Sequence, residues 1–66
     1  MRVLVESRDF KRTVTLANGA NIEKLFQKMK LRNNDFVATL NGEIVLRDEP
    51  LKNGDKIKLY CAVGGG

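Results

Sequence analysis

The 66-residue chain contains no histidine, no tryptophan and a single cysteine, Cys61. Without histidine it cannot form a Ser–His or Cys–His nucleophilic pair from its own residues. Its acidic residues and its cysteine show none of the spacings that are typical of common metal sites. One cysteine also excludes an internal disulfide, as expected for a reducing compartment. We therefore expect no catalytic residue, no metal and no bound cofactor, and we do not expect the chain to be an enzyme.

Long apolar segments are also absent. The stretch Val3-Leu4-Val5 is too short for the apolar region of a signal peptide, and no segment approaches the ~20 apolar residues of a membrane span. We expect a soluble, cytoplasmic protein with no membrane partner. A single domain of this size buries only about 60% of the surface of its unfolded chain. Because little interior is left for a pocket, the size favours a carrier, modifier or binding module.

Basic residues outnumber acidic residues by 12 to 8, which gives a net charge of +4 at pH 7. A basic chain can bind nucleic acid by neutralising phosphates. Here the basic residues are spread along the chain among acidic ones, and no basic run is interleaved with aromatic residues. A nucleic-acid-binding site is typically a concentrated basic patch or stripe. We therefore expect an ordinary solvated surface and no nucleic-acid partner.

Alternating apolar residues predict two strands near the N-terminus, at residues 2–6 and 12–16, joined as a hairpin by the turn-forming residues 7–10. A helix of about three turns should follow and end near Leu31. Asn21 is a favourable N-cap for it. Four apolar residues recur at the spacing that lines one helical face: Ile22, Leu25, Phe26 and Met29.

Three further strands are predicted at residues 36–40, 43–46 and 56–63. The first two are joined by Asn41-Gly42, the strongest short signal for a tight hairpin turn. Asn53-Gly54-Asp55 forms a second turn, just before the last strand. One helix covering a mixed sheet is the simplest two-layer arrangement of these elements.

The predicted fold is therefore α+β, with a mixed sheet of four to five strands packed on one helix. A last strand lying parallel to the first would make it a β-grasp fold, although periodicity does not give that pairing. We expect a domain at residues 1–63 and a flexible glycine tail at residues 64–66. Cys61 is assigned to the core because cysteine is commonly buried. The predicted core consists of Val3, Val5, Val14, Leu16, Ile22, Leu25, Phe26, Met29, Leu51, Ile57, Leu59 and Cys61.

The final glycines follow directly from the last predicted strand. Such residues can be no more than a loose end, but residues 62–66 could reach about 16 Å beyond the domain. Because glycine has no Cβ, Gly64 and Gly65 would allow the tail to thread a narrow channel in a partner. The carboxylate of Gly66 would then lie close to a nucleotide. Activation as an adenylate would make it an electrophile without any catalytic side chain from this chain.

Three motifs follow one another along the sequence: Leu40-Asn41-Gly42-Glu43-Ile44-Val45, Leu51-Lys52-Asn53-Gly54-Asp55-Lys56-Ile57 and the ending Val63-Gly64-Gly65-Gly66. With these three motifs in this order, the chain resembles the ThiS/MoaD family over essentially its whole length. These ubiquitin-like sulfur carriers serve thiamine and molybdopterin biosynthesis and have the β-grasp fold. The short length and the final glycines are more similar to the thiamine branch.

The resemblance implies that an E1-like adenylyltransferase uses ATP and magnesium to adenylate Gly66. A persulfide sulfur donor would convert the adenylate to a thiocarboxylate. The sulfur would then pass to thiazole synthase or to the large subunit of molybdopterin synthase. Two alternatives stay open: a ubiquitin-like protein modifier or tRNA-thiolation carrier that acts through Gly66, and a β-grasp binding module with an incidental glycine tail.

A docking face for the activating enzyme is also expected. Tyr60 falls on the side of the last strand opposite the core, where a β-grasp fold would bring it near Leu4, flanked by Lys58 and Arg2. An apolar patch with a charged rim is typical of a surface that binds a protein. We therefore predict docking through Leu4, Tyr60 and Val63.

Overall fold

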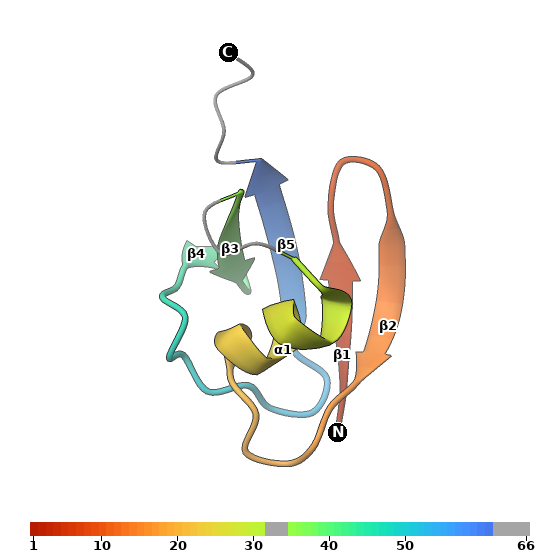
Figure 1. Ribbon diagram of the computed structural model, residues 1–66, viewed down its shortest axis with the longest axis vertical. Helices are drawn as coiled ribbons and strands as arrows, with labels where there is room; N and C mark the ends of the chain where they lie inside the picture. Colours follow the sequence, from red (N-terminus) through yellow and green to blue (C-terminus); the bar gives the residue numbers. More distant parts are fainter. Residues whose placement is uncertain (32–34, 62–66) are drawn as a thin grey trace.

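The computed structural model describes residues 1–31 and 35–61. Within them, five strands form one sheet and one helix covers a face of that sheet (Figure 1). The elements are β1 (Arg2–Glu6), β2 (Lys11–Thr15), α1 (Ile22–Met29), β3 (Phe36–Leu40), β4 (Glu43–Ile44) and β5 (Lys56–Cys61). No helix in this described part is long and apolar enough to cross a membrane.

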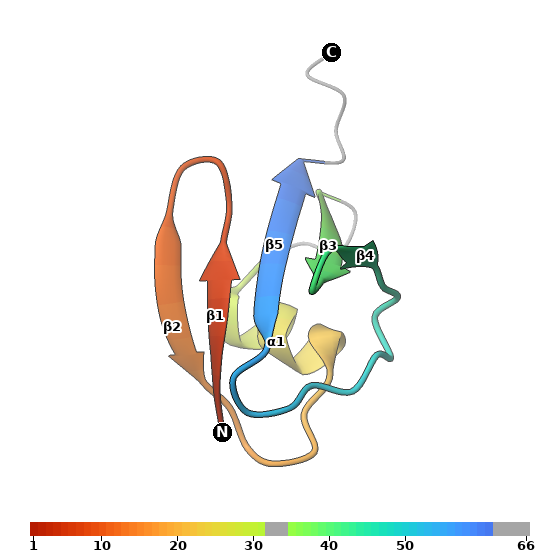
Figure 2. The ribbon, with the colours of Figure 1, turned by 180° about the vertical axis from the view of Figure 1, so that it is seen from behind.

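The strands lie in the order β2-β1-β5-β3-β4, so the last strand is at the centre of the sheet (Figure 2). It runs parallel to β1 and antiparallel to β3. Both hairpins, β1–β2 and β3–β4, are antiparallel. The parallel pairing of the first and last strands confirms the α+β, β-grasp fold, with a mixed sheet of five strands on one helix.

Local capping sets both ends of α1. The Asn21 Oδ1 atom accepts a hydrogen bond of 2.9 Å from the backbone N–H of Lys24, which confirms Asn21 as the N-cap. At the other end Lys30 adopts the left-handed conformation, with φ 59° and ψ 39°, and its N–H donates to the carbonyl of Gln27. The helix therefore ends at Met29, about two residues before the predicted end.

The β3–β4 hairpin turns at Asn41-Gly42, where both φ angles are positive, at 52° and 93°. Two positive φ angles are the requirement of a type I′ turn, which is why this dipeptide is favoured there. β4 is shorter than the predicted strand at residues 43–46, although the Val45 N–H still donates to the Ala38 carbonyl at 3.1 Å.

A second turn holds the start of β5 against β1. The Asp55 carboxylate accepts a hydrogen bond from the Lys52 N–H at 2.7 Å. The Asn53 side chain accepts from the Arg2 N–H at 2.8 Å, and the Gly54 N–H donates to the Arg2 carbonyl at 2.8 Å. Gly54 has φ +88°, a conformation that residues with a Cβ rarely adopt. The predicted turn thus also fixes where the last strand begins.

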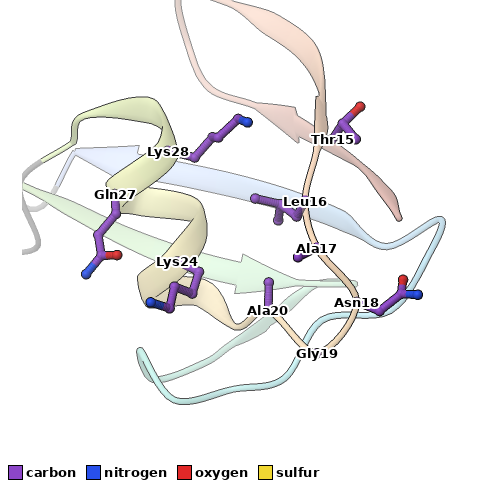
Figure 3. Close-up of a pocket in the computed structure, with 9 residues that line it drawn as sticks. All are labelled: Thr15, Leu16, Ala17, Asn18, Gly19, Ala20, Lys24, Gln27 and Lys28. Carbon is purple, nitrogen blue, oxygen red and sulfur yellow. The ribbon is translucent and has the colours of Figure 1, made fainter.

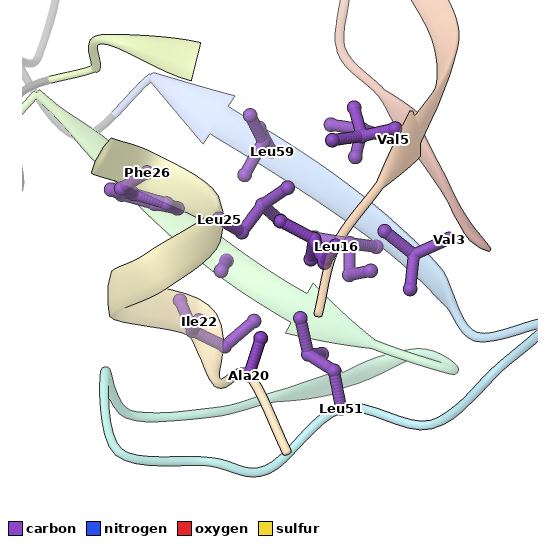
Figure 4. Packing of buried hydrophobic residues seen from close by; sticks show 12 residues of the cluster. Val3, Val5, Leu16, Ala20, Ile22, Leu25, Phe26, Leu51 and Leu59 are labelled. Carbon is purple, nitrogen blue, oxygen red and sulfur yellow. The ribbon is translucent and has the colours of Figure 1, made fainter. Parts of the chain in front are cut away.

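The core lies between α1 and the sheet (Figure 4). Most of the predicted core residues are buried there, and Met29 is half-buried against them. Ala20, Ala38 and Thr39 are buried as well, and the Thr39 hydroxyl donates to the Lys58 carbonyl at 3.1 Å. The buried apolar residues are Val3, Val5, Val14, Leu16, Ala20, Ile22, Leu25, Phe26, Ala38, Leu51, Ile57 and Leu59.

The prediction that Cys61 belongs to the core is wrong, because Cys61 is exposed. The alternation along β5 is kept, since Cys61 pairs with Phe36 two positions beyond the buried Leu59. However, the pairing of β5 with β1 ends at Lys58, opposite Glu6. The tip of β5 also extends beyond α1 (Figure 1). Cys61 therefore lies on the helix side of the sheet at a point that the helix does not cover.

Candidate functional site

The carboxyl end of β5 lies at the same edge of the molecule as the β1–β2 loop (Figure 1). A hollow of about 520 Å³ occupies this edge, lined by residues 7–9 of that loop, by Phe36 and by residues 58–61. The described part of the chain ends here, at Cys61, five residues before Gly66. Val63, Gly64, Gly65 and Gly66 lie outside the described residues, so their predicted roles stay predictions.

Leu4 and Tyr60 both lie on the outer face, which we define as the face of the sheet away from α1. Each alternates with buried neighbours on its strand, and Tyr60 is 49% exposed while Leu4 is half-buried. Both line one shallow hollow of about 290 Å³. Leu4 is in register with Lys56, so Tyr60 lies four residues further along β5, roughly 13 Å at the usual rise of a strand.

The predicted charged neighbours of Tyr60 are only partly correct. Lys58 lies two residues before Tyr60 on β5 and lines the same hollow. Arg2, in contrast, precedes Leu4 and is hydrogen-bonded to Gly54, at the opposite end of the pairing between β1 and β5. Arg2 therefore does not flank Tyr60. The separation of Arg2 from Tyr60 follows from the register of β1 against β5. The sequence gives no local signal for that register.

The outer face includes apolar residues that the sequence analysis did not assign to it. Val37 pairs with Tyr60, and Ile44 pairs with Thr39. Ile44 and Leu46 are 73% and 75% exposed. Leu46 follows the end of β4, and the hollow that it lines with Ile44 at the β3–β4 edge also includes Ile22 and Phe26 of α1. The sequence did contain a signal for the position of these residues. The alternation of residues 36–40 and 43–46 assigns Val37 and Ala38 to opposite faces of the sheet, and likewise Ile44 and the half-buried Val45.

The helix side carries a separate hollow of about 530 Å³ between α1 and the segment that connects β2 to it (Figure 3). Its floor includes the buried residues Leu16 and Ala20, and Lys24 and Lys28 lie on its rim. The ammonium groups of the two lysines point in different directions (Figure 3). They do not converge on a shared ligand position.

No group of three or more acidic, cysteine or histidine side chains that could hold a metal occurs among residues 1–31 and 35–61. The motif residues in these ranges have structural roles instead: Asn41-Gly42 forms the hairpin turn, and Asn53-Gly54-Asp55 holds β5 beside β1.

Comparison with known families identifies the chain. The profile of the ThiS family matches residues 1–66, including the glycine ending. The chain belongs to the ThiS family. This family and the related MoaD-like proteins are small sulfur carriers of thiamine and molybdopterin biosynthesis rather than catalysts.

Solved structures agree with this assignment. SAMP1 from Haloferax volcanii superposes with a TM-score of 0.79 at 15% identity, over 100% of both chains. A molybdopterin converting factor subunit 1 from Pyrococcus furiosus gives 0.78 at 22% identity, over 94% of this chain and 98% of that one. The thiamine biosynthesis protein ThiS from Geobacter metallireducens gives 0.66 at 25% identity, over 96% and 99%. The first two likenesses establish the shared fold alone.

Proposed function

We propose that this ThiS-family chain carries sulfur as a thiocarboxylate on Gly66, for the thiazole of thiamine. The observation that carries the proposal is the family match over residues 1–66, which includes the three final glycines. The position of β5 supports it, because the strand that leads toward the ending is the central strand of the sheet. A rigid central strand is a firm base for presenting a short segment to a partner.

Two partners supply the chemistry. An E1-like adenylyltransferase holds ATP and magnesium, and the Gly66 carboxylate attacks the α-phosphorus so that pyrophosphate leaves. A persulfide donor then attacks the acyl carbon, and AMP leaves. A thiol cleaves the resulting acyl disulfide and releases the thiocarboxylate, which thiazole synthase uses. The proposed location is the cytoplasm, where ATP and persulfide donors are both present.

Mass spectrometry of the intact protein tests the proposal. The chain is incubated with the adenylating enzyme of its own organism, ATP, magnesium, a persulfide donor and a thiol that cleaves the acyl disulfide. We expect a new species that is heavier by the exchange of one oxygen for sulfur. Two controls should yield none: a chain lacking Gly65 and Gly66, and a semisynthetic chain that ends in the amide of Gly66. The amide is the sharper control because it removes the carboxylate and keeps every residue.

Other outcomes distinguish the alternatives. If the mass stays unchanged while a ladder of lysine conjugates forms in extract from the same cells, the chain is a ubiquitin-like modifier. If the thiocarboxylate forms but is used by the large subunit of molybdopterin synthase and not by thiazole synthase, the pathway assignment is wrong. If the chain lacking Gly65 and Gly66 keeps its activity in cells, the glycine ending is incidental and the carrier proposal fails.

A further inference from the structure

The outer side of β2 is an unpaired strand edge within the described part of the chain, because β2 ends the strand order and pairs with β1 alone. Met1 and Leu16 exchange two backbone hydrogen bonds of 2.8 Å, one in each direction. Such pairs alternate along an antiparallel ladder, so the N–H and C=O groups of Thr13 and Thr15 point away from β1. The edge therefore presents backbone donors and acceptors to a further polypeptide strand.

The hollow of about 530 Å³ on the helix side adjoins this edge (Figure 3). Thr15 belongs to both, since it lies on β2 and lines the hollow. Leu16 and Ala20 form an apolar floor, and Lys24 and Lys28 border it from one side of α1. A strand bonded to β2 would lie about 4.8 Å from it and would point every second side chain to the helix side. Those side chains would lie over the floor of the hollow.

The rim of the hollow is basic. Among the described residues that line it, Lys24 and Lys28 carry charge and none is acidic. Lys11 and Arg12, exposed at the start of β2, add two positive charges along the edge. A small ligand is usually fixed by polar groups that converge on it, whereas the ammonium groups of the two lysines diverge (Figure 3). Separated charges beside a strand edge suit an extended chain that carries several carboxylates.

Two other occupants fit less well. A second copy of this chain would bring a basic edge to a basic edge, and charged residues on an edge strand oppose such pairing. A nucleic acid would match the positive charge, but it has no row of amide donors and acceptors that could pair with the backbone of β2. The described lining also contains no aromatic residue on which a base could stack. Edge and charge together favour an acidic polypeptide.

We propose that the outer edge of β2 and the adjoining hollow bind an extended acidic segment of a partner protein, which joins the sheet as a sixth strand. Aliphatic side chains of this segment cover Leu16 and Ala20, and its carboxylates lie near Lys24 and Lys28. Backbone hydrogen bonds to β2 supply affinity, while the hollow selects the side chains.

The proposed site lies apart from the carboxyl end of β5. The segment that connects β2 to α1 is at the opposite end of the molecule (Figure 1), and β1 separates β2 from β5 in the sheet. A partner bound at the edge of β2 therefore leaves the end of β5 uncovered. One protein can hold the chain while another acts on its glycine ending. The inference does not rest on the proposed function.

Two labelled synthetic peptides test the site. One has four valines followed by four glutamates, and the other has the reverse order, so that a strand can add in either direction. Valine is chosen because it favours strands. Binding is followed by fluorescence anisotropy and by NMR. We expect at least one peptide to bind saturably and to shift the amide signals of Thr13 and Thr15 more than those of β4, at the other edge of the sheet.

Two double variants separate the site from the net charge. Lys24→Glu with Lys28→Glu changes the rim, and Lys56→Glu with Lys58→Glu on β5 is the matched control. All four lysines are exposed, and each exchange removes two charges, so both variants lower the net charge from +4 to zero. At about 0.15 M salt the rim variant should bind at least ~10-fold more weakly, because like charges then meet. The control should lose less than about threefold, since distant charges are screened.

A proline tests the added strand itself. Thr15→Pro removes an N–H that points away from β1, a position at which edge strands tolerate proline. It should weaken peptide binding at least ~10-fold, because a peptide carbonyl loses its donor. Thr15→Ala keeps the N–H and should change binding by less than about threefold. If circular dichroism shows that the proline variant does not fold, peptides N-methylated at alternate residues replace it: one set should abolish binding, and the other should preserve it.

Four results would overturn the inference: no binding of either peptide, equal losses in the two double variants, equal binding of both N-methylated sets, or displacement of the peptide by an oligonucleotide that needs the same lysines. A concentration-dependent dimer that Thr15→Pro abolishes would make a second copy the occupant, and would overturn it too. Thiocarboxylate formation reports on the proposed function alone, and the Thr15→Pro chain should form it as readily as the wild type.

Discussion

Asn21 shows how one side chain decides where an element begins. Its amide oxygen accepts the N–H of Lys24, one of the backbone donors that the first turn of a helix leaves without a partner inside the helix. The segment between β2 and α1 also contains Asn18, which is exposed and, like Asn21, follows an alanine. The two asparagines therefore form a matched pair in which only one caps α1.

Replacing Asn21 by alanine should lower the free energy of unfolding by about 1 kcal/mol, because the Lys24 N–H loses its acceptor. Asn18→Ala should change it by less than about 0.5 kcal/mol, as is usual for an exposed substitution. Urea denaturation measures both changes, provided that the slope of the unfolding free energy against urea concentration is the same in each variant. Equal losses in the two variants would show that the cap does not stabilise the fold, and Asn21→Asp should keep most of the stability.

At the scale of whole elements, the sequence predicts what is local. The spacing of Ile22, Leu25 and Phe26 defines the buried face of α1, and Asn41-Gly42 defines the hairpin turn because its conformation depends on those two residues alone. The end of α1 was predicted less well. Lys30 adopts a left-handed conformation that favours glycine or asparagine, so a search for typical C-cap residues passes over it.

Substituting glycine at Lys30, the C-cap of α1, and at Lys28 inside the helix should therefore have opposite effects. Lys30 has φ 59°, where a residue with a Cβ is strained by about 1–2 kcal/mol. Lys30→Gly should raise the free energy of unfolding by about 0.5–1 kcal/mol after allowing for the greater freedom of unfolded glycine. Lys28→Gly, inside the helix, should lower it by about 1 kcal/mol.

Urea titrations of both variants beside the wild type measure these changes as shifts of the midpoint. The decisive observation is the sign at Lys30. A loss of stability in both variants would mean that Lys30 carries no backbone strain in solution and that α1 ends elsewhere.

At the scale of the whole molecule, the sheet pairs the first strand of the chain with β5, the last described one. Arg2 is hydrogen-bonded to Asn53 and Gly54, across 51 residues of sequence for the contact with Asn53. No local pattern encodes such a pairing, and the expectation of a parallel arrangement came from the family resemblance. The same limit explains the wrong prediction for Cys61. The alternation placed this residue on the correct side of the sheet, but its exposure depends on where β1 and α1 stop covering β5.

Because β5 lies between β1 and β3, its amides are bonded on both sides of the strand, whereas β2 and β4 lie at the edges of the sheet. Central amides should exchange with solvent only when the entire domain unfolds, and edge amides through smaller openings. We therefore expect the amide hydrogens of Ile57 and Leu59 to exchange most slowly. Those of β4, a two-residue strand, should exchange at least ~10-fold faster, since local openings need less free energy than global unfolding.

Hydrogen exchange followed by NMR in low concentrations of urea tests this ordering, after correction for intrinsic exchange rates. Exchange at Ile57 and Leu59 should depend on urea as steeply as global unfolding does, because both expose the same surface. Exchange in β4 should depend on urea only weakly. If the β4 amides are as slow as those of β5 and equally sensitive to urea, the domain opens as a single unit. The sheet would then have no weaker edge, and Ile44 would lie on a strand as rigid as the centre.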